Sequence, residues 1–314
     1  MNILVIGGTG FLGRAIVEQL VYAHIDCTVL TRSPEKMARF SKPLPYIVGD
    51  LLEYENLDLT PFQYIINCSG ELKNRALMQS LHVDALQGLL LRVHTSSPKI
   101  HWLQISSVGV YGAVKKNKIM ENEPFSPQGT YEITKADGEL LIKNFCEIHN
   151  MSYTIIRPSN VFGCDMPNQS LAQLITMIKK GLFFYISKTP QTIAMNYVPV
   201  EDVAHFVCCC INNPAAINQD FIISDYISQA EFVEIVCAEL KLKNSFLYVP
   251  ELLIRLLAKL AYVIPRFPLT DSRVDALTIK TIYSTEKAQS RLAFSPSMGL
   301  KQGLKKYINY LYKK

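Results

Sequence analysis

The 314-residue chain lacks several patterns that would assign it to a particular class of protein. No run of eighteen or more uninterrupted apolar residues occurs, so we expect no membrane span. The start, "MNILVIGGTG", has no basic segment followed by a long apolar region, which predicts no signal peptide. Long runs of one charge are also missing from a chain of net charge +5. The basic tail "LKKYINYLYKK" is explained more simply by a terminal helix with one solvated face than by nucleic-acid binding.

Metal-site and disulfide patterns are missing too. None of the eight cysteines forms a Cys-x-x-Cys pair. Cys208 to Cys210 are adjacent, and adjacent residues of a helix point in different directions, so they do not converge on a metal. We therefore predict no metal site and eight reduced, mostly buried thiols, as is typical of a cytoplasmic protein.

Alternating patterns in the first half predict the fold class. Short apolar segments alternate there with helical patterns, which indicates a parallel sheet covered by helices on both faces. We predict a Rossmann-type doubly wound α/β fold, in which ligands bind at the carboxyl ends of the strands. Expected strands are 2–7, 27–32, 45–50, 63–69, 100–107 and 152–159, and expected helices are 11–23, 34–40, 76–94 and 131–149.

The pattern becomes looser after about residue 160. Helical segments are expected at 170–181, 201–211, 229–241, 250–262 and 299–312, with a short strand at 219–225. No internal repeat or low-complexity linker separates the two halves. We predict a dinucleotide-binding domain at 1–160, to which 190–225 returns, and a smaller, mostly helical substrate lobe built from 161–189 and 226–314.

The stretch "ILVIGGTGFLGRAIVEQL" combines an apolar strand, a tight glycine turn and an amphipathic helix. Gly7, Gly10 and Gly13 allow a sharp turn and a close approach of the backbone to a pyrophosphate. The N–H groups at the start of the helix then bind the anion. A glycine turn between an N-terminal strand and a helix predicts a dinucleotide site.

The end of the second expected strand, "VLTRS", bears on the choice of dinucleotide. An acidic residue there would accept the ribose hydroxyls of NAD. This chain has Thr31 and Arg32 instead, and a guanidinium suits a 2′-phosphate, so we favour NADP over NAD. Asp50, after the third strand, either contacts adenine or caps the next segment.

Three segments have the spacing Tyr-x-x-x-Lys: "YEITK" (131–135), "YSTEK" (283–287) and "YLYKK" (310–314). Only the first follows a strand that ends in serines, Ser106 and Ser107. Lys135 falls on the same helix face as Tyr131, one turn later. The other two segments are more simply explained as helix-surface residues. We therefore place proton transfer at the 131–135 segment.

The motifs "GGTGFLG", "SSVGVYG", "YEITK", "RPSNVFG" and "NYVPVEDVA" occur in this order over nearly the whole chain. In this the chain resembles the extended short-chain dehydrogenases/reductases, the NAD-dependent epimerase/dehydratase family, and within them the enzymes that modify nucleotide-activated sugars for surface polysaccharides. One departure concerns the helix before the fifth strand. Relatives often carry an asparagine there, and this chain has Asp84 in "HVDALQGLL".

The resemblance implies a catalytic set of Ser107, Tyr131 and Lys135. Tyr131 would be the general acid/base, with its phenol, which ordinarily titrates near 10, made more acidic by the Lys135 ammonium and by the nicotinamide charge when the cofactor is oxidised. Ser107, or Ser106 if the strand register differs, would bind the reacting oxygen.

The resemblance also implies which residues contact cofactor and substrate. Substrate contacts would come from Ser107, Val108, Asn160, Asn168 and Arg273, where Asn168 caps a helix or binds a diphosphate, and Arg273 is either a phosphate ligand or an exposed arginine at a helix start. The cofactor contacts would be Gly7, Thr9, Gly10, Phe11, Leu12, Gly13, Arg32, Asp50, Leu51, Cys68, Ser69, Gly70, Ser106, Tyr131, Lys135, Pro158, Asn160 and Val161.

Four functions fit these features. We favour an NADPH-dependent reductase of a nucleotide-linked keto-sugar. The alternatives are a sugar-nucleotide 4-epimerase that retains NAD, an enzyme similar to 3β-hydroxysteroid dehydrogenases, and a silent cofactor-binding subunit. The apolar, cationic segment 250–268 fits the core face of a lobe helix better than a membrane surface. Relatives pair through the helix that carries the Tyr-Lys box, so a homodimer is also considered.

Overall fold

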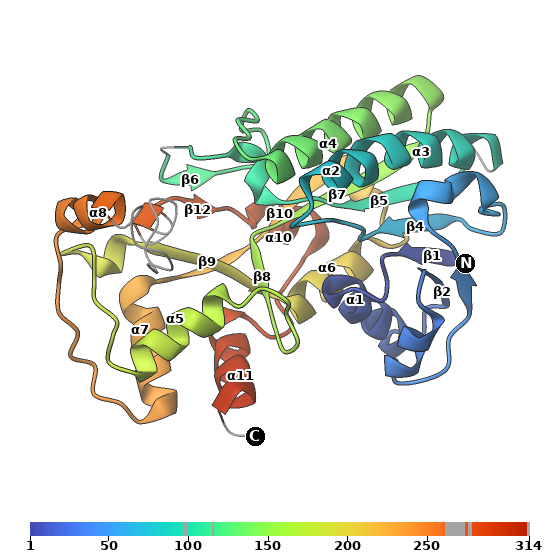
Figure 1. Ribbon diagram of the computed structural model, residues 1–314. Helices are drawn as coiled ribbons and strands as arrows, with labels where there is room; N and C mark the ends of the chain where they lie inside the picture. Colours follow the sequence, from blue (N-terminus) through green and yellow to red (C-terminus); the bar gives the residue numbers. More distant parts are fainter. Residues whose placement is uncertain (97–98, 115, 261–273, 276–277, 313–314) are drawn as a thin grey trace.

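The main sheet has seven strands, all parallel to their neighbours (Figure 1). The computed structural model describes residues 1–96, 99–114, 116–260, 274–275 and 278–312. The strand order β10-β7-β5-β4-β1-β2-β3 confirms the Rossmann-type doubly wound fold. Its strands are β1 (Ile3–Ile6), β2 (Cys27–Thr31), β3 (Tyr46–Val48), β4 (Tyr64–Asn67), β5 (His101–Ile105), β7 (Ser152–Pro158) and β10 (Gln219–Ile223).

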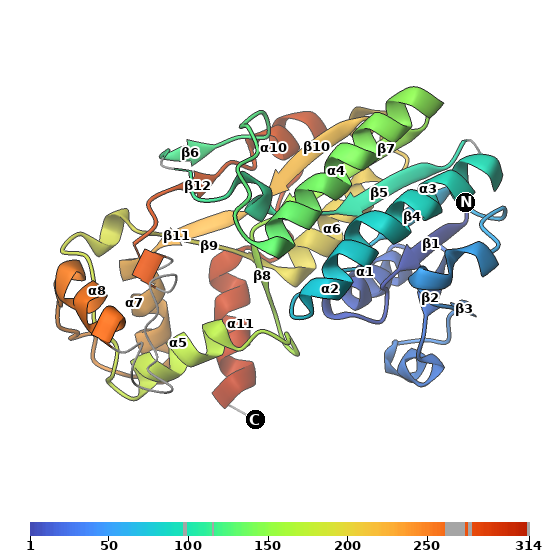
Figure 2. The same ribbon diagram turned by 45° about the horizontal axis from the view of Figure 1, so that its top comes forward.

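Helices cover both faces of this sheet because successive side chains of each strand point to opposite sides. Ile3 and Val5 of β1 pack in one core cluster with α1 (Phe11–Tyr22) and α6 (Val200–Cys210). Leu4 and Ile6 belong to a second cluster, with α3 (Ala85–Ser96) and α4 (Thr130–His149). Figures 1 and 2 show these two helix layers on opposite sides of the strands.

A smaller lobe of helices lies beside the sheet (Figure 2). Its own core joins a three-stranded sheet to three helices. The strands are β8 (Asn160–Phe162), β9 (Ala194–Pro199) and β11 (Asp225–Ser228), and the helices are α5 (Ser170–Lys179), α7 (Gln229–Leu240) and α11 (Leu300–Tyr312). The helices confirm the expected, mostly helical lobe, whereas its three strands were not expected, and β9 lies within 190–225, which was predicted to return to the first domain.

Helix α8 (Glu251–Leu260) lies at the far end of the lobe (Figure 1). Ile254 is buried against Ile186 and Val274, as expected for a core-facing helix. Leu252 and Leu253 of the same helix are exposed, so α8 also presents apolar side chains to solvent. Residues 261–268 of the apolar, cationic segment lie outside the described residues, and its contact with a membrane surface stays an alternative. Among the described residues, no helix has the length and apolarity needed to cross a bilayer.

Several expected elements differ from those observed. The helix expected at 34–40 is a 3₁₀ helix (Pro34–Arg39). The single helix expected at 76–94 is three pieces: α2 (Arg75–Gln79), a π-helical turn (Ser80–Asp84) and α3. The two-residue strands β6 (Lys118–Ile119) and β12 (Ile282–Tyr283) were not expected, because such short pairs carry no periodicity. Helix α10 (Glu286–Leu292) follows β12.

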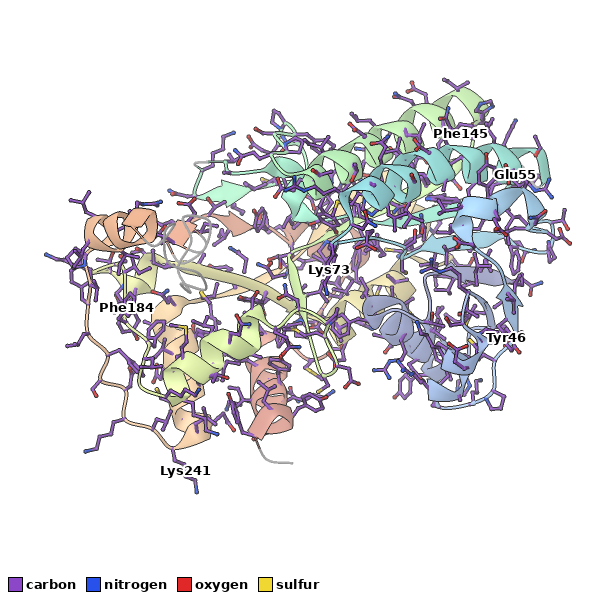
Figure 3. All side chains as sticks on the ribbon, viewed as in Figure 1. Tyr46, Glu55, Lys73, Phe145, Phe184 and Lys241 are labelled. Carbon is purple, nitrogen blue, oxygen red and sulfur yellow. The ribbon has the colours of Figure 1, made fainter. Side chains whose placement is uncertain are left out.

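The strand register brings the functional loops together. Ile6 of β1 lies opposite Asn67 of β4, and Asn67 lies opposite Gln104 of β5. The loops that follow these three strands therefore start at one edge of the sheet. Figure 3 shows Lys73, in the loop after β4, near the middle of the molecule, with Tyr46 and Phe184 towards opposite ends.

Candidate active site

The glycine turn between β1 and α1 has the geometry that a dinucleotide site needs. Gly7 has φ +72°, a left-handed conformation that favours glycine, and its carbonyl accepts the Gly10 N–H at 3.0 Å. A Cβ on Gly13 would lie 2.2 Å from the Gly7 oxygen, so only glycine lets α1 approach the turn this closely. Gly10 provides no side-chain cap for α1, so the first N–H groups of this helix can bind an anion. The predicted contacts Gly7, Thr9, Gly10, Phe11, Leu12 and Gly13 all lie in this turn and the start of α1.

The ends of β2 and β3 bring Arg32 and Asp50 together. The Arg32 guanidinium lies 3.5 Å from the Asp50 carboxylate, and the Arg32 side chain is 70% exposed. Asp50 also accepts the Leu52 N–H at 3.1 Å, so it caps the following 3₁₀ helix (Leu51–Asn56), one of the two roles considered for it. Leu51 is buried in the core, below this surface.

The loop after β4 touches the glycine turn. A Cβ on Gly7 would lie 2.9 Å from the Ser69 nitrogen, so the two backbones are in close contact. The Ser69 hydroxyl donates to the Asn67 side chain at 2.6 Å, which fixes the start of the loop. Cys68 is half-buried, and burial raises the pKa of its thiol to about 12, so it is an inert neighbour of the site. Gly70 follows on the surface.

The two serines after β5 have different surroundings. Ser107 is half-buried and accepts the Gly109 N–H at 3.1 Å, which starts the 3₁₀ turn Val108–Tyr111. Ser106 is buried, and its hydroxyl has no hydrogen-bond partner among the described residues. It faces a cavity of about 10 Å³, roughly the space of one water molecule. This cavity is also lined by Asn67, His82, Gln104, Lys135 and Glu139.

Lys135 is held between the ends of two strands. Its ammonium donates to the Ser69 carbonyl at 3.3 Å, after β4, and to the Ile105 carbonyl at 3.2 Å, at the end of β5. Burial lowers the pKa of Lys135 to about 8, and Glu139, one turn further along α4, acts in the opposite direction. The predicted Tyr-Lys helix therefore lies against the loops that carry the other predicted site residues.

Tyr131 precedes Lys135 by one turn, as the spacing predicts. Its ring centre is 6.0 Å from the Lys135 ammonium. Burial raises the pKa of Tyr131 to about 12. Burial is thus the main influence on this phenol in the protein alone, and its acidification by the Lys135 ammonium together with an oxidised nicotinamide stays a prediction.

His82 is a residue of the site that the sequence did not reveal. It lies in the π-helical turn, is buried, and presents its ring edge-on to Tyr131 with the centroids 5.7 Å apart. Asp84, which aligned with the family asparagine, is exposed on the outer side of the helix. Residue spacing could not predict that His82 faces inward and Asp84 outward, because a π turn shifts which residues of a helix face inward.

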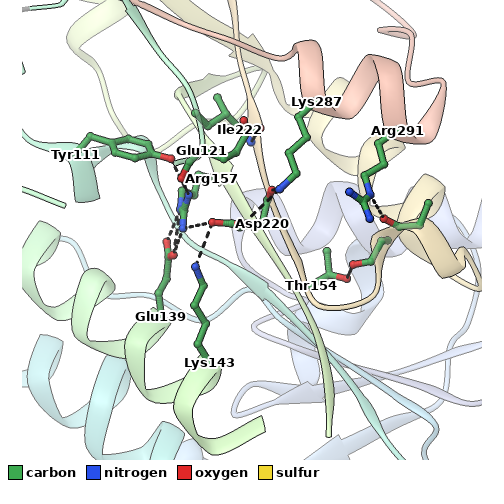
Figure 4. Close-up of polar contacts among 12 residues, drawn as sticks. Tyr111, Glu121, Glu139, Lys143, Thr154, Arg157, Asp220, Ile222, Lys287 and Arg291 are labelled. Carbon is green, nitrogen blue, oxygen red and sulfur yellow. Dashed lines mark hydrogen bonds and ion pairs between the residues drawn. The ribbon is translucent and has the colours of Figure 1, made fainter. Parts of the chain in front are cut away.

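Glu139 links the site to a cluster of charges between α4, β7 and β10 (Figure 4). Arg157 of β7 is fully buried and contacts Glu139 and Asp220, each with an oxygen at 2.6 Å. The Tyr111 hydroxyl lies 2.6 Å from the same guanidinium. Burial raises the pKa of Asp220, but Arg157, Lys143 and Lys287 outweigh it, so the pKa lies below its usual value. This cluster also went unpredicted, because its members come from distant parts of the chain.

The segment after β7 makes structural contacts. Pro158 is the last residue of β7, and Val161 lies in the middle of β8. The Asn160 amide donates to the Asn196 carbonyl at 2.9 Å, which joins β8 to β9. Asn168 accepts the N–H of Ser170, the first residue of α5, at 2.9 Å, although the N-cap position of this helix is Gln169. Arg273 lies outside the described residues.

The other Tyr-x-x-x-Lys segments belong to other elements of the fold. Tyr283 is in β12, where its ring stacks against Tyr111 at 6.5 Å, and Lys287 donates to the Asp220 carbonyl at 2.8 Å. The interpretation of this pair as helix-surface residues is wrong, because both are half-buried and Tyr283 is in a strand. In the third segment, Tyr310 donates to Asp165 at 2.7 Å, at the contact of the lobe with α1.

The described residues hold no cluster of three or more histidine, cysteine or acidic side chains that could bind a metal. All eight cysteines are free, four of them buried and four half-buried.

Residues 3–224 match the model of the NAD dependent epimerase/dehydratase family. The chain belongs to this family. This confirms the resemblance on which the site residues were predicted, and the glycine turn fits the dinucleotide of the family.

Individual relatives are distant. The chain is 28% identical over 191 residues to the low-salt glycan biosynthesis protein Agl12 of Haloferax volcanii, a match covering 56% of this chain and 60% of that protein. The chain therefore spans about three fifths of the length of that relative. UDP-glucose 4-epimerase of Vibrio cholerae is 24% identical over 320 residues, covering 97% of this chain and 93% of the enzyme.

Among solved structures, UDP-glucose 4-epimerase of Thermotoga maritima, in complex with UDP-glucose, matches with a TM-score of 0.75 at 20% identity. The match covers 100% of this chain and 99% of that one. At this identity the likeness shows the shared fold, lobe included.

Proposed function

We propose that the chain is an NADPH-dependent reductase of a nucleotide-activated keto-sugar in surface polysaccharide biosynthesis. One observation carries the proposal: the Lys135 ammonium bridges the backbone after β4 and at the end of β5, next to the glycine turn and one helical turn from Tyr131. A dinucleotide in the turn would thus have an ammonium and a phenol at its reactive end. The substrate would enter from the lobe, for which we keep the boundaries 161–189 and 226–314.

The proposed roles follow from the state of each group. A phenol of ordinary pKa near 10 is protonated at neutral pH, and burial raises the pKa of Tyr131 further, to about 12, so Tyr131 has the form that donates a proton to a carbonyl oxygen. A reductase needs this form at the start of the reaction. Ser107 would donate a second hydrogen bond to that oxygen, and Lys135 would bind the nicotinamide ribose. The bound nicotinamide supplies the hydride.

A sugar-nucleotide 4-epimerase is the second candidate, favoured by the match over 93% of the Vibrio cholerae UDP-glucose 4-epimerase. That reaction begins with removal of a proton from an alcohol, which requires the phenolate form of Tyr131.

The eight free thiols suit a reducing compartment, and we propose a cytoplasmic enzyme.

Three measurements separate the candidates. Native mass spectrometry of the purified protein identifies any cofactor that is retained, which we expect to be absent or NADP rather than tightly held NAD. NADPH oxidation is then followed with dTDP- and UDP-linked 4-keto-6-deoxy sugars, and interconversion of UDP-glucose and UDP-galactose is measured in parallel. Interconversion without NADPH consumption would establish the epimerase instead.

Tyr131→Phe tests the mechanism. The variant keeps the ring and loses the proton, so we expect turnover to fall by at least 10³-fold while the Kd for NADPH stays within twofold. Tyr283→Phe, in the unrelated Tyr-x-x-x-Lys segment, is the control and should retain turnover. A Tyr131→Phe enzyme with more than a tenth of wild-type activity would refute the assigned role.

A further inference from the structure

We propose that His82 is a positioning residue for the Tyr131–Lys135 pair, and that it does so by binding the loop after β4 to the first turn of α4. The contacts Glu71–His82–Thr134–Tyr131 are called the His82 link below. The proposal rests on the proposed function only for the identity of the reacting pair.

The π-helical turn explains why a histidine can reach this position. Residues Ser80–Asp84 form backbone hydrogen bonds that reach one residue further than those of an α-helix, and they lie directly between α2 and α3. Helix α4 approaches this turn closely at Gly138, where a Cβ would lie 2.7 Å from the His82 carbonyl oxygen. Close contact of the two helices leaves the His82 side chain 5% exposed and beside the Tyr131 ring.

The hydrogen bonds of the ring define its tautomer. The Glu71 N–H donates to Nε2 at 3.0 Å, so Nε2 carries no proton. The proton is therefore on Nδ1, which donates to the Thr134 hydroxyl at 2.8 Å. Thr134 in turn donates to the Tyr131 carbonyl at 3.2 Å. The His82 link thus runs from the loop, through a neutral imidazole, to the backbone of the proposed acid.

The loop at the other end of the link is itself ordered. The Glu71 carboxylate accepts the N–H groups of Leu72, Lys73 and Asn74 at 2.9, 2.7 and 3.1 Å. The same loop provides the Ser69 carbonyl that accepts from Lys135. Helix α4 is therefore attached to this loop at two points, one through Lys135 and one through His82.

The surroundings keep the imidazole neutral. Burial, followed by the positive charge of Lys135, lowers the pKa of His82 to about 3, and Glu71 opposes this only weakly. The other ionisable groups that face it are Tyr131 and Glu139. A histidine that never charges near neutral pH cannot serve as the acid of the reaction, and it can hold a fixed hydrogen-bond geometry throughout.

The first test needs neither cofactor nor substrate. In the full chain labelled with ¹⁵N-histidine, the His82 signals are assigned by their loss in His82→Gln. We expect the Nδ1–H tautomer with no titration between pH 8 and pH 5. An Nε2–H tautomer, or titration near pH 6.5, would overturn the proposal.

The second test separates positioning from stability. His82→Leu should lower kcat by roughly 10- to 100-fold, since a displacement of about 1 Å in a reacting group has effects of this size. The KM for NADPH should stay within twofold. His82→Asn should recover much of kcat, because its amide nitrogen takes the place of Nδ1.

His101 provides a matched control. It is also 5% exposed, and both its ring nitrogens are bonded, to Ser152 and Thr154 at 2.9 Å, at the opposite end of β5. His101→Leu should lower the melting temperature about as much as His82→Leu and leave kcat within twofold. Equal loss of kcat in both variants would assign His82 a structural role only and overturn the proposal.

A double variant tests the link itself. Thr134→Val should lower kcat as His82→Leu does, and the double variant should lose no more than either single one, because both break the same chain of contacts. If the fold-loss of kcat in the double variant equals the product of the two single losses, the two residues act independently and the His82 link is contradicted. If the ¹⁵N signals are as expected and no nucleotide sugar is turned over, the His82 link stands and the proposed function fails. If nucleotide sugars are turned over and the ¹⁵N signals differ from those expected, the His82 link fails and the proposed function stands.

Discussion

Arg32 extends into solvent from the end of β2, and its guanidinium meets the Asp50 carboxylate at 3.5 Å. In this exposed pair the two charges are screened by water, so the contact contributes little to stability and remains open to a competing anion. A 2′-phosphate is such an anion, and it would bind the guanidinium with charge-assisted hydrogen bonds.

The Arg32→Ala variant should therefore lose its preference for NADPH. We expect the ratio of the Kd values for NADH and NADPH to fall by roughly 10- to 100-fold, since hydrogen bonds to charged groups contribute about 1.5–3 kcal/mol. Asp50→Asn should tighten NADPH binding, because it removes a negative charge beside the phosphate. Fluorescence titration measures both constants. Arg291→Ala, on the distant helix α10, is the control, and an unchanged ratio in Arg32→Ala would refute the role of Arg32.

Residue types and spacings were enough to place Tyr131 and Lys135 on one face of a helix, with Ser107 nearby. They gave no indication of the raised pKa of Tyr131, because burial depends on everything that packs around the ring. His82 was missed for a related reason, since only the π turn directs it inward. Local chemistry was predictable here, and the environment of each group was not.

At the scale of elements, the buried strands of the main sheet were predicted to within a few residues, because apolar runs between helices have few other interpretations. The break in the helix at 75–96 was not predictable from the apolar pattern alone. The short strands β6 and β12, which pair with each other, were missed as well, since each has only two residues. Strand β10 was expected as a strand, but only the structure pairs it with β7.

The buried charge cluster connects three of these elements, and its loss should be severe. Arg157→Met leaves the buried Glu139 carboxylate without its partner, which we expect to lower the free energy of unfolding by about 3–5 kcal/mol. Urea unfolding followed by circular dichroism gives this quantity. Lys306→Met breaks a half-exposed pair with Glu201 and should cost less than about 1 kcal/mol.

The Arg157→Met/Glu139→Gln double variant completes the experiment. It removes both buried charges, so it should recover part of the loss seen in Arg157→Met. Additive losses in the double variant would show that the two side chains stabilise the protein independently, contrary to the contact seen in the structure.

At the scale of the molecule, α4 and α3 form an outer surface (Figures 1 and 2). Ile133, Leu140 and Ile148 are exposed along one side of α4, and Leu91 is exposed on the neighbouring α3. Their spacing of seven and eight residues places the α4 residues in one stripe. An exposed apolar stripe of this kind can pack against the same stripe of a second copy of the chain. This agrees with the homodimer considered from the sequence, in which the helices that carry the Tyr-Lys box pair.

We predict a homodimer of two 35.5 kDa chains that Leu140→Glu converts to a monomer. A stable dimer buries about 1,600 Å² in total, and a charge in the centre of such an interface has no partner. Light scattering during size-exclusion chromatography gives the mass directly. Leu182→Glu, at an exposed leucine of the lobe, should leave the mass unchanged. A wild-type monomer at micromolar concentration would contradict the prediction.

Acid should destabilise the whole fold from an unusually high pH, because two histidines are buried in neutral form. Burial lowers the pKa of His82 to about 3 and that of His101 to about 4, whereas both titrate near 6.5 in the unfolded chain. Between pH 6.5 and about 4 the unfolded state therefore binds two protons that the folded state does not. Stability must fall as pH falls through this range, by up to about 1.4 kcal/mol per pH unit for each histidine.

Carboxylates add to the loss only at lower pH. The lowered pKa of Asp220 stabilises the fold above the usual aspartate value, and this contribution disappears as pH falls below about 4. Burial raises the pKa of Glu121, which opposes the loss, so the histidines are isolated by comparing wild type with a variant in urea unfolding at pH 7, 6 and 5. The His82→Gln/His101→Gln variant should be less stable than wild type at pH 7 and show a flatter decline towards pH 5. An equally steep decline in the variant would mean that other groups take up the protons, and that the two imidazoles are charged in the folded protein after all.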